Sequence, residues 1–157
     1  MKTTRLVMMM LALLLSTISM AQNADILYKE GKALYDAKDY DKAFPKLKAA
    51  AEKGHKKAQY RLGRCYDKGH GTAEDNVTAV KWYKKSSDQG YAKAHFQMGK
   101  AYMKGKGVAA DESKARTLLR KAVNDEKHGK EIMEKLRSDA DAGDADAQQM
   151  LTLIKKK

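Results

Sequence analysis

The protein has 157 residues and a strongly basic composition, with 32 Lys and Arg against 20 Asp and Glu and a formal net charge of +12. A single cysteine, Cys65, excludes an intramolecular disulfide, so packing has to stabilise the fold. Proline occurs once, and few β-branched residues lie beyond the first 21 residues, which favours helix almost everywhere. Cys65 lies in a strongly helical segment and is interpreted as a small buried apolar residue rather than a nucleophile.

Residues 1–21 have the three-part pattern of a secretory signal peptide. A positive start containing Lys2 precedes an unbroken apolar run over residues 6–15, and small residues lead to an expected cleavage point after Ala21. We expect a bacterial protein that is exported to the periplasm or secreted, with a mature domain at 22–157 that has no transmembrane segment. An uncleaved membrane anchor is the weaker alternative, because so short a run does not span a bilayer of about 30 Å.

A repeat with a period of 36 residues follows. Residues 58–75 read AQYRLGRCYDKGHGTAED, and residues 94–111 read AHFQMGKAYMKGKGVAAD. Identities at one fixed offset indicate a repeated structural unit. The identical pairs are Ala58 and Ala94, Gly63 and Gly99, Tyr66 and Tyr102, Gly69 and Gly105, Gly71 and Gly107, Asp75 and Asp111, and Ala79 and Ala115.

Each unit is predicted to be a helix, a loop and a second helix. Ala58, Leu62 and Tyr66 recur every four residues and line one face of the first helix. Gly63 lies beside that face, where the absence of a side chain permits close approach of the second helix. The second helix is expected to pack through Ala79, Trp82, Tyr83 and Ser86.

Loop and cap residues mark where these helices begin and end. Gly69 and Gly71 can adopt backbone conformations that other residues resist. A short carboxylate precedes each second helix and is expected to cap it, while glycines end it as left-handed caps. The expected acidic caps are Asp39, Asp75 and Asp111, and the expected glycine caps are Gly54 and Gly90.

These hairpins are expected to fill most of the mature chain. The sequence GDADAQQML at 143–151 repeats GHKKAQYRL at 54–62, which indicates an incomplete last unit. The predicted segments are units at about 24–55, 56–91 and 92–126, an inserted helix at 127–142 and a partial C-terminal unit at 143–157.

The pattern resembles the Sel-1-like repeat, a relative of the tetratricopeptide repeat, over about residues 24–125 and again over 143–153. The resemblance implies an all-α fold, an α/α solenoid of stacked helical hairpins, and an adaptor role. Leu118 and Leu119 depart from the Trp-Tyr pair of the family. The residues that match the family pattern are Ala58, Leu62, Gly63, Tyr66, Gly69, Gly71, Asp75, Ala79, Trp82, Tyr83, Lys85 and Gly90.

The sequence contains no recognisable catalytic or metal-binding motif. A zinc site needs about four convergent ligands, usually in close pairs. The histidines have no such partners and are interpreted as surface or loop residues: His55, His70, His95 and His128. No phosphate-binding loop or serine nucleophile motif is present. We therefore expect no enzyme activity, no catalytic residue, no metal and no cofactor.

A binding groove is expected along the first helices, which line the inner surface of tetratricopeptide-like solenoids. Counting from the Leu-Gly pair of each unit gives an aromatic row and a cationic row side by side. Such rows suit an extended protein or peptide that is acidic or carries a free carboxylate. Alternatively, the aromatic residues pack between units and the cations only solubilise the chain. The residues are Tyr28, Tyr60 and Phe96, and Lys32, Arg64 and Lys100.

The sequence thus predicts an exported scaffold for protein–protein or protein–peptide interaction. The alternative is a hydrolase acting on cell-wall or β-lactam substrates, which a cysteine-rich secreted branch of the family suggests, although this chain lacks the cysteine pairs of that branch. Nucleic acid is not an expected partner, because export separates the protein from it. The basic charge allows weak attraction to anionic lipid or polysaccharide.

Overall fold

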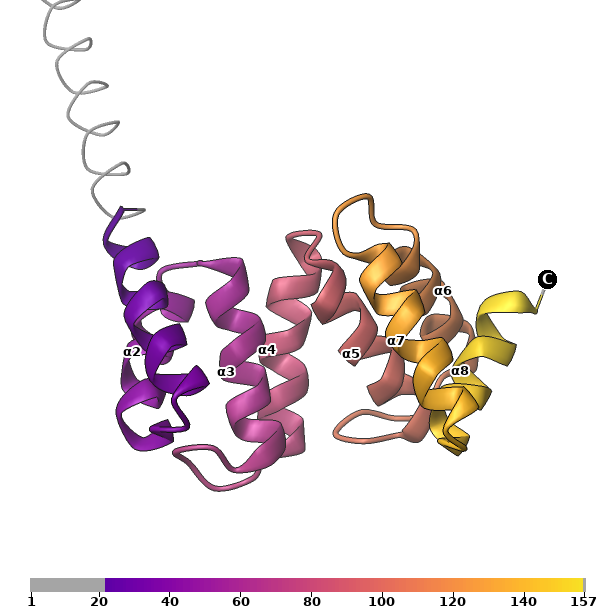
Figure 1. Ribbon diagram of the computed structural model, residues 1–157. Coiled ribbons are helices and arrows are strands. Elements are labelled where there is room, and N and C mark those ends of the chain that lie inside the picture. The colour runs from indigo at the N-terminus through magenta and orange to yellow at the C-terminus, as the bar shows by residue number, and fades with distance from the viewer. Residues whose placement is uncertain (1–21, 157) are drawn as a thin grey trace, which may run out of the picture.

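The structure is a computed structural model that describes residues 22–156, and every regular element in that range is a helix (Figure 1). None of these helices is long and apolar enough to cross a membrane. The chain is helical over 22–36, and the later helices are α2 (Tyr40–Glu52), α3 (Lys56–Lys68), α4 (Asn76–Asp88), α5 (Ala92–Lys104), α6 (Glu112–Val123), α7 (Gly129–Asp141) and α8 (Ala145–Lys155).

The helices pair into hairpins that stack along the chain. The helix at 22–36 and α2 form unit 1, α3 and α4 form unit 2, and α5 and α6 form unit 3. The second helix of one unit packs on the first helix of the next, α2 on α3 and α4 on α5. Figure 1 shows the hairpins following one another in a row. The predicted all-α fold, an α/α solenoid, is therefore confirmed for the described residues.

A glycine lets the two helices of each unit approach closely. A Cβ on Gly63 would lie 2.6 Å from Cδ1 of Tyr83, and a Cβ on Gly99 would lie 2.7 Å from Cγ of Leu119. Both distances are below what real Cβ atoms tolerate. The predicted role of Gly63 is thus confirmed, and unit 1 has the same contact, between Gly31 and Leu47.

Neighbouring units meet at the loop glycines. Gly71 and Gly107 have φ values of +70° and +72°, which side-chain-bearing residues rarely adopt. A Cβ on Gly71 would overlap the carbonyl of Tyr40, at the start of α2, and a Cβ on Gly107 would overlap the carbonyl of Asn76, at the start of α4. The loops of units 2 and 3 therefore rest on the main chain of the unit before them.

The predicted acidic caps are confirmed. Asp75 accepts a hydrogen bond from the backbone N–H of Thr78 at 3.0 Å, and Asp111 accepts one from Lys114 at 2.9 Å. Asp39 makes the same contact with the N–H of Lys42 at 3.4 Å. These carboxylates satisfy N–H groups that have no partner inside the helix. The glycine caps adopt the expected left-handed conformation, at Gly54 and Gly90.

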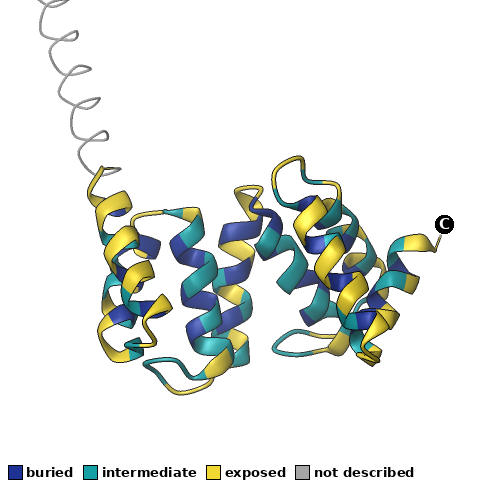
Figure 2. Ribbon diagram, in the orientation of Figure 1, coloured by how far each residue is buried: buried dark blue, intermediate teal, exposed yellow. Residues whose placement is uncertain are grey.

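The core lies between the helices and is built largely from small residues. Figure 2 shows the buried residues on the sides of the helices that face one another. Ala79, Tyr83 and Ser86 of α4 are buried as expected, whereas Trp82 is only partly buried. Cys65 is fully buried, and burial raises the pKa of its thiol to about 11. This confirms the interpretation of Cys65 as a core residue.

Helix α7 follows α6 after a short connection at 124–128, and α8 repeats the start of a first helix. Asp144 caps α8 by accepting from the N–H of Ala147 at 2.9 Å. The amide of Gln148 donates to the carbonyl of Ala140 at 3.1 Å, as Gln59 of α3 donates to Ala51 at 3.2 Å. Helix α7 therefore packs against α8 in the way that α2 packs against α3. This agrees with the sequence match between GDADAQQML and GHKKAQYRL.

The contact at Gly63 predicts whether replacing this glycine stabilises or destabilises the protein. In a solvated helix, Gly→Ala stabilises by about 1 kcal/mol through helix propensity. Gly63→Ala is expected instead to destabilise the protein by about 1–3 kcal/mol, because the new methyl group collides with the Tyr83 ring. Urea denaturation followed by circular dichroism measures the change. A variant as stable as the wild type, or more stable, would show that the helices do not depend on this contact.

Candidate functional site

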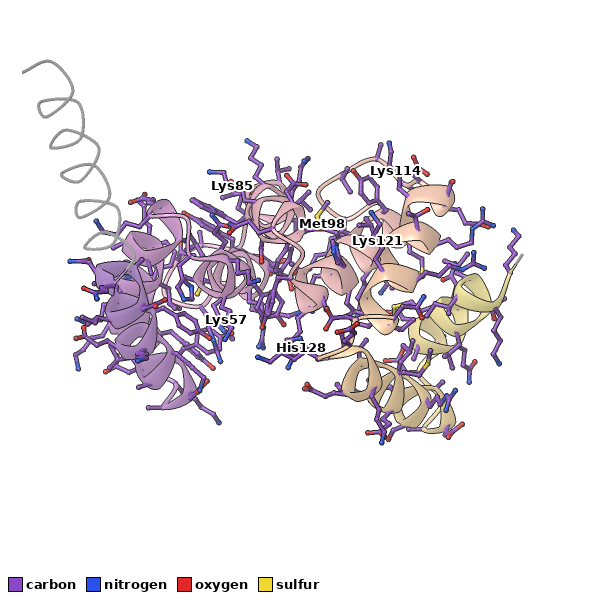
Figure 3. All side chains as sticks on the ribbon, turned by 90° about the horizontal axis from the view of Figure 1, so that it is seen from above. Lys57, Lys85, Met98, Lys114, Lys121 and His128 are labelled. Carbon is purple, nitrogen blue, oxygen red and sulfur yellow. The ribbon has the colours of Figure 1, made fainter. Side chains whose placement is uncertain are left out.

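The first helices form one side of the molecule. Figure 3 shows Lys57 of α3 and His128 along this side, with Lys85 of α4 and Lys114 of α6 on the opposite side. We call it the first-helix face and define it by the residues that the contacts below connect: Tyr28, His55, Tyr60, Arg61, Arg64, Tyr91 and His128.

The predicted groove residues occupy equivalent places in the three units. The aromatic residues Tyr28, Tyr60 and Phe96 each stand three positions before the glycine of the helix contact. The cations Lys32, Arg64 and Lys100 each stand one position after it. The aromatic and cationic positions are therefore the same in each hairpin, although their surroundings differ.

The aromatic row is longer than the sequence analysis proposed. The Tyr28 ring stacks on His55 with ring centroids 4.3 Å apart. Tyr60 meets Tyr91 edge to face at 5.3 Å, and Tyr91 meets His128 at 5.6 Å. His55 and Tyr91 occupy the N-cap positions of α3 and α5, directly after the glycines that end the preceding helices, but only the His55 side chain accepts a capping hydrogen bond. The sequence analysis missed them, although this position after a capping glycine is a usable signal.

The cations of this face differ in their partners. Lys32 forms an ion pair with Asp36, and Arg61 pairs with the same carboxylate at 3.2 Å. The guanidinium of Arg64 lies 5.5 Å over the Tyr35 ring. Within residues 22–156, Arg64 has no carboxylate within ion-pairing distance. It is partly buried and keeps its charge at physiological pH, because a guanidinium cannot be deprotonated in proteins.

The C-terminal helices cover the equivalent surface of unit 3. Phe96 packs against the buried cluster that contains Ile132, and against a second cluster that contains Leu136, both from α7. Lys100 lies 3.9 Å from the carboxylate of Asp146, at the start of α8. The structure thus separates the six predicted residues into two groups. In units 1 and 2 Lys32 is exposed, whereas Tyr28, Tyr60 and Arg64 are partly buried. Tyr28 and Tyr60 also pack against buried clusters that contain residues of the next unit, as the alternative interpretation of the aromatic residues expected. Phe96 and Lys100 of unit 3 contact α7 and α8.

The interpretation of the histidines as surface or loop residues is confirmed for His55, His70 and His128, which lie between helices, whereas His95 lies within α5. Each is partly buried and has a side-chain partner. His55 accepts from the backbone N–H of Ala58 at 3.1 Å and caps α3. His70 lies 2.9 Å from the Tyr35 hydroxyl, and His95 lies 2.6 Å from the Ser87 hydroxyl. The repeat pattern of the sequence did not predict these hydrogen bonds, because they join residues on different helices and loops.

The described residues offer no metal centre. No group of three or more His, Cys, Asp or Glu in that range is placed to hold an ion. The aromatic and cationic side chains of the first-helix face offer apolar contact and ionic hydrogen bonds instead.

Together, the stacked hairpins define an α-helical repeat protein. Residues 56–91 and 92–125 match the family model of the Sel1 repeat. The chain thus contains Sel1 repeats at units 2 and 3, and the first unit lies outside the match.

Two solved structures have the same fold. One is a Sel1 repeat protein from Oxalobacter formigenes, with 31% sequence identity and a TM-score of 0.59, matching 77% of this chain and 56% of that one. The other is a protective antigen present in uropathogenic Escherichia coli strains, with 27% identity and a TM-score of 0.64, matching 83% of this chain and 28% of that one. The chain thus spans about half of the first protein and about a quarter of the second.

The partly buried histidines predict how stability depends on pH. Burial lowers the pKa of His55, His70 and His95 below the ordinary value. The unfolded chain therefore binds more protons near pH 6 than the folded chain does. Stability is expected to be present above pH of about 6.5, the ordinary histidine pKa, and to fall as the pH falls below it. Thermal unfolding at pH 7.5, 6.5 and 5.5 measures the change.

A His95→Gln variant serves as the control for this prediction, because it cannot titrate in that range. Its melting temperature should fall less between pH 7.5 and 5.5 than that of the wild type. The carboxylates of the acidic caps do not interfere, since their pKa values are lowered and they titrate at more acidic pH. A wild-type melting temperature that is constant or rises on acidification would contradict the assignment.

Proposed function

We propose that this protein is a non-enzymatic scaffold that binds an extended segment of another protein across the first-helix face of units 1 and 2. Sel1 repeats commonly mediate protein–protein interaction, and this chain contains them. The observation that carries the proposal is the environment of Arg64, a partly buried guanidinium among tyrosine rings without a carboxylate partner in the described chain.

The composition of the face suits a protein ligand. Tyrosine and arginine are enriched at the centres of protein interfaces, because they combine a large contact area with directional polar groups. Tyr60 is held by edge-to-face contact with the buried Tyr91, so it loses little side-chain freedom on binding. Arg64 can then form two parallel hydrogen bonds to one carboxylate. We infer that the bound segment supplies an acidic side chain or a C-terminal carboxylate at this point.

The proposal includes export of the protein. This part rests on the signal-peptide pattern of residues 1–21, which lie outside the residues that the structure describes. Mature protein would then meet its partners in the periplasm or outside the cell. The alternative function, a cell-wall or β-lactam hydrolase, receives no support from the similar structures or from the side chains of the face.

Partner capture by three variants tests the proposal. Tyr60→Ala and Arg64→Ala are expected to weaken binding about tenfold or more, which corresponds to about 1.4 kcal/mol for each anchor lost. Lys100→Ala is the matched control, because it removes one positive charge at the equivalent position of unit 3, where Asp146 already lies nearby. Proteins cross-linked to the full chain in cells of the native organism are quantified by mass spectrometry. Circular dichroism verifies that each variant is folded.

An Arg64→Lys variant separates charge from geometry. It keeps the positive charge but loses the planar guanidinium, so it should also weaken binding if a carboxylate docks in the bidentate manner. Equal capture of the same proteins by the wild type, Arg64→Ala and Tyr60→Ala would exclude the first-helix face as the binding site.

A further inference from the structure

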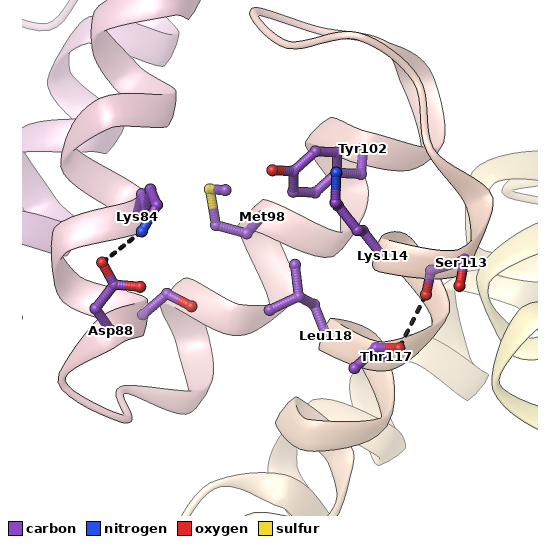
Figure 4. Close-up of a pocket in the computed structure, with 9 residues that line it drawn as sticks. Lys84, Asp88, Met98, Tyr102, Ser113, Lys114, Thr117 and Leu118 are labelled. Atoms are coloured by element: carbon purple, nitrogen blue, oxygen red, sulfur yellow. Dashed lines mark hydrogen bonds and ion pairs between the residues drawn. The ribbon is translucent and has the colours of Figure 1, made fainter.

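A cavity of about 290 Å³ opens on the side of the molecule opposite the first-helix face, between α4, α5 and α6 (Figure 4). Met98, which is only 3% exposed, and the partly buried Tyr102 and Leu118 form its apolar floor. Exposed polar residues surround the opening, among them Lys84 and Lys114. The cavity is therefore apolar inside and polar at its edge, as binding sites for small apolar groups are.

The preceding pair of units shows what this space accommodates. Counting back one repeat of 36 residues, the position of Leu118 is taken by Trp82, that of Met98 by Leu62 and that of Tyr102 by Tyr66. Trp82 packs against the buried cluster that contains Leu62, together with Tyr66. An indole of the chain itself thus occupies the space between units 1 and 2.

In unit 3 the equivalent apolar residues are present, but leucine replaces the tryptophan. Leucine is much smaller than tryptophan, so Leu118 leaves unfilled the volume that a Trp82-like side chain would occupy. An apolar cavity of about 150 Å³ is large enough to bind benzene. A cavity of about 290 Å³ can therefore admit the larger indole ring.

Two exposed lysines, Lys84 and Lys114, and the exposed Asp88 lie at the edge of the cavity. Lys84 pairs with Asp88 at 2.7 Å, and Lys114 pairs with Asp111 at 3.1 Å, but each lysine side chain remains 63% exposed. The Lys114 ammonium also lies 5.5 Å from the centroid of the Tyr102 ring, above the cavity floor. The whole chain carries a formal charge of +12, and removal of residues 1–21, which contain Lys2 and Arg5 and no acidic residue, would leave +10, so an acidic segment is attracted at long range as well.

We propose that this cavity is a second docking site. It binds an aromatic side chain, above all the indole ring of a tryptophan, from an acidic segment of a partner protein. The site lies on the side of the solenoid opposite the first-helix face, and Tyr60 of that face packs against the same buried cluster as Met98. The partner's ring takes the place that Trp82 takes between units 1 and 2, and a carboxylate beside it meets Lys84 or Lys114.

N-acetyl-tryptophan, which joins an indole to a carboxylate, is the probe for the test. It is titrated into the full chain labelled with ¹³C at the methionine methyl groups. The Met98 signal is expected to shift and saturate because the methyl group lies on the cavity floor. Met150, in the buried cluster between α6, α7 and α8, is the internal control and should not move. Absence of a saturable Met98 shift, or an equal shift of Met150, would overturn the proposal.

Leu118→Trp fills the cavity from within and should weaken probe binding about tenfold or more. Leu118→Phe adds fewer atoms and provides the same test if the tryptophan variant does not fold. Arg64→Ala should leave the Met98 shift unchanged, so failure of this site and failure of the first-helix face are distinguishable. A folded Leu118→Trp or Leu118→Phe variant that binds the probe as tightly as the wild type would place the ligand elsewhere.

Discussion

The close contact between the two helices of each hairpin determines the rest of the structure. In three units a glycine of the first helix faces a large side chain of the second, Leu47, Tyr83 or Leu119. The short distance at this point sets how each helix is rotated about its axis. It thereby decides which side chains enter the core and which reach the first-helix face. Arg64 follows Gly63 in the chain, so its place over Tyr35 depends directly on this packing.

Much of the fold could be predicted from the sequence, because the signals that define it are local. Asp75 and Asp111 cap helices that begin at the next residue, and the glycines of the loops adopt the positive φ that their positions required. The repeat made each of these signals stronger, since one pattern recurred at a constant offset. Burial of Cys65 followed from its helical surroundings in the same way.

The candidate site was less predictable, because its contacts join segments that are far apart in the chain. Phe96 and Lys100 have the same local sequence context as Tyr60 and Arg64, but α7 and α8 fold back over them. The stacking of Tyr28 on His55 depends on how unit 1 rests on unit 2. Likewise, the replacement of tryptophan by Leu118 is visible in the sequence, whereas the cavity that it leaves emerges only when three helices are assembled.

The loop glycines that rest on the main chain at Tyr40 and Asn76 have an evolutionary consequence. Backbone atoms, which are common to all amino acids, set the spacing from one unit to the next. The superhelical pitch is therefore insulated from substitutions at the side chains of either surface. Related chains are free to vary the side chains on both surfaces, while the geometry that presents them stays constant.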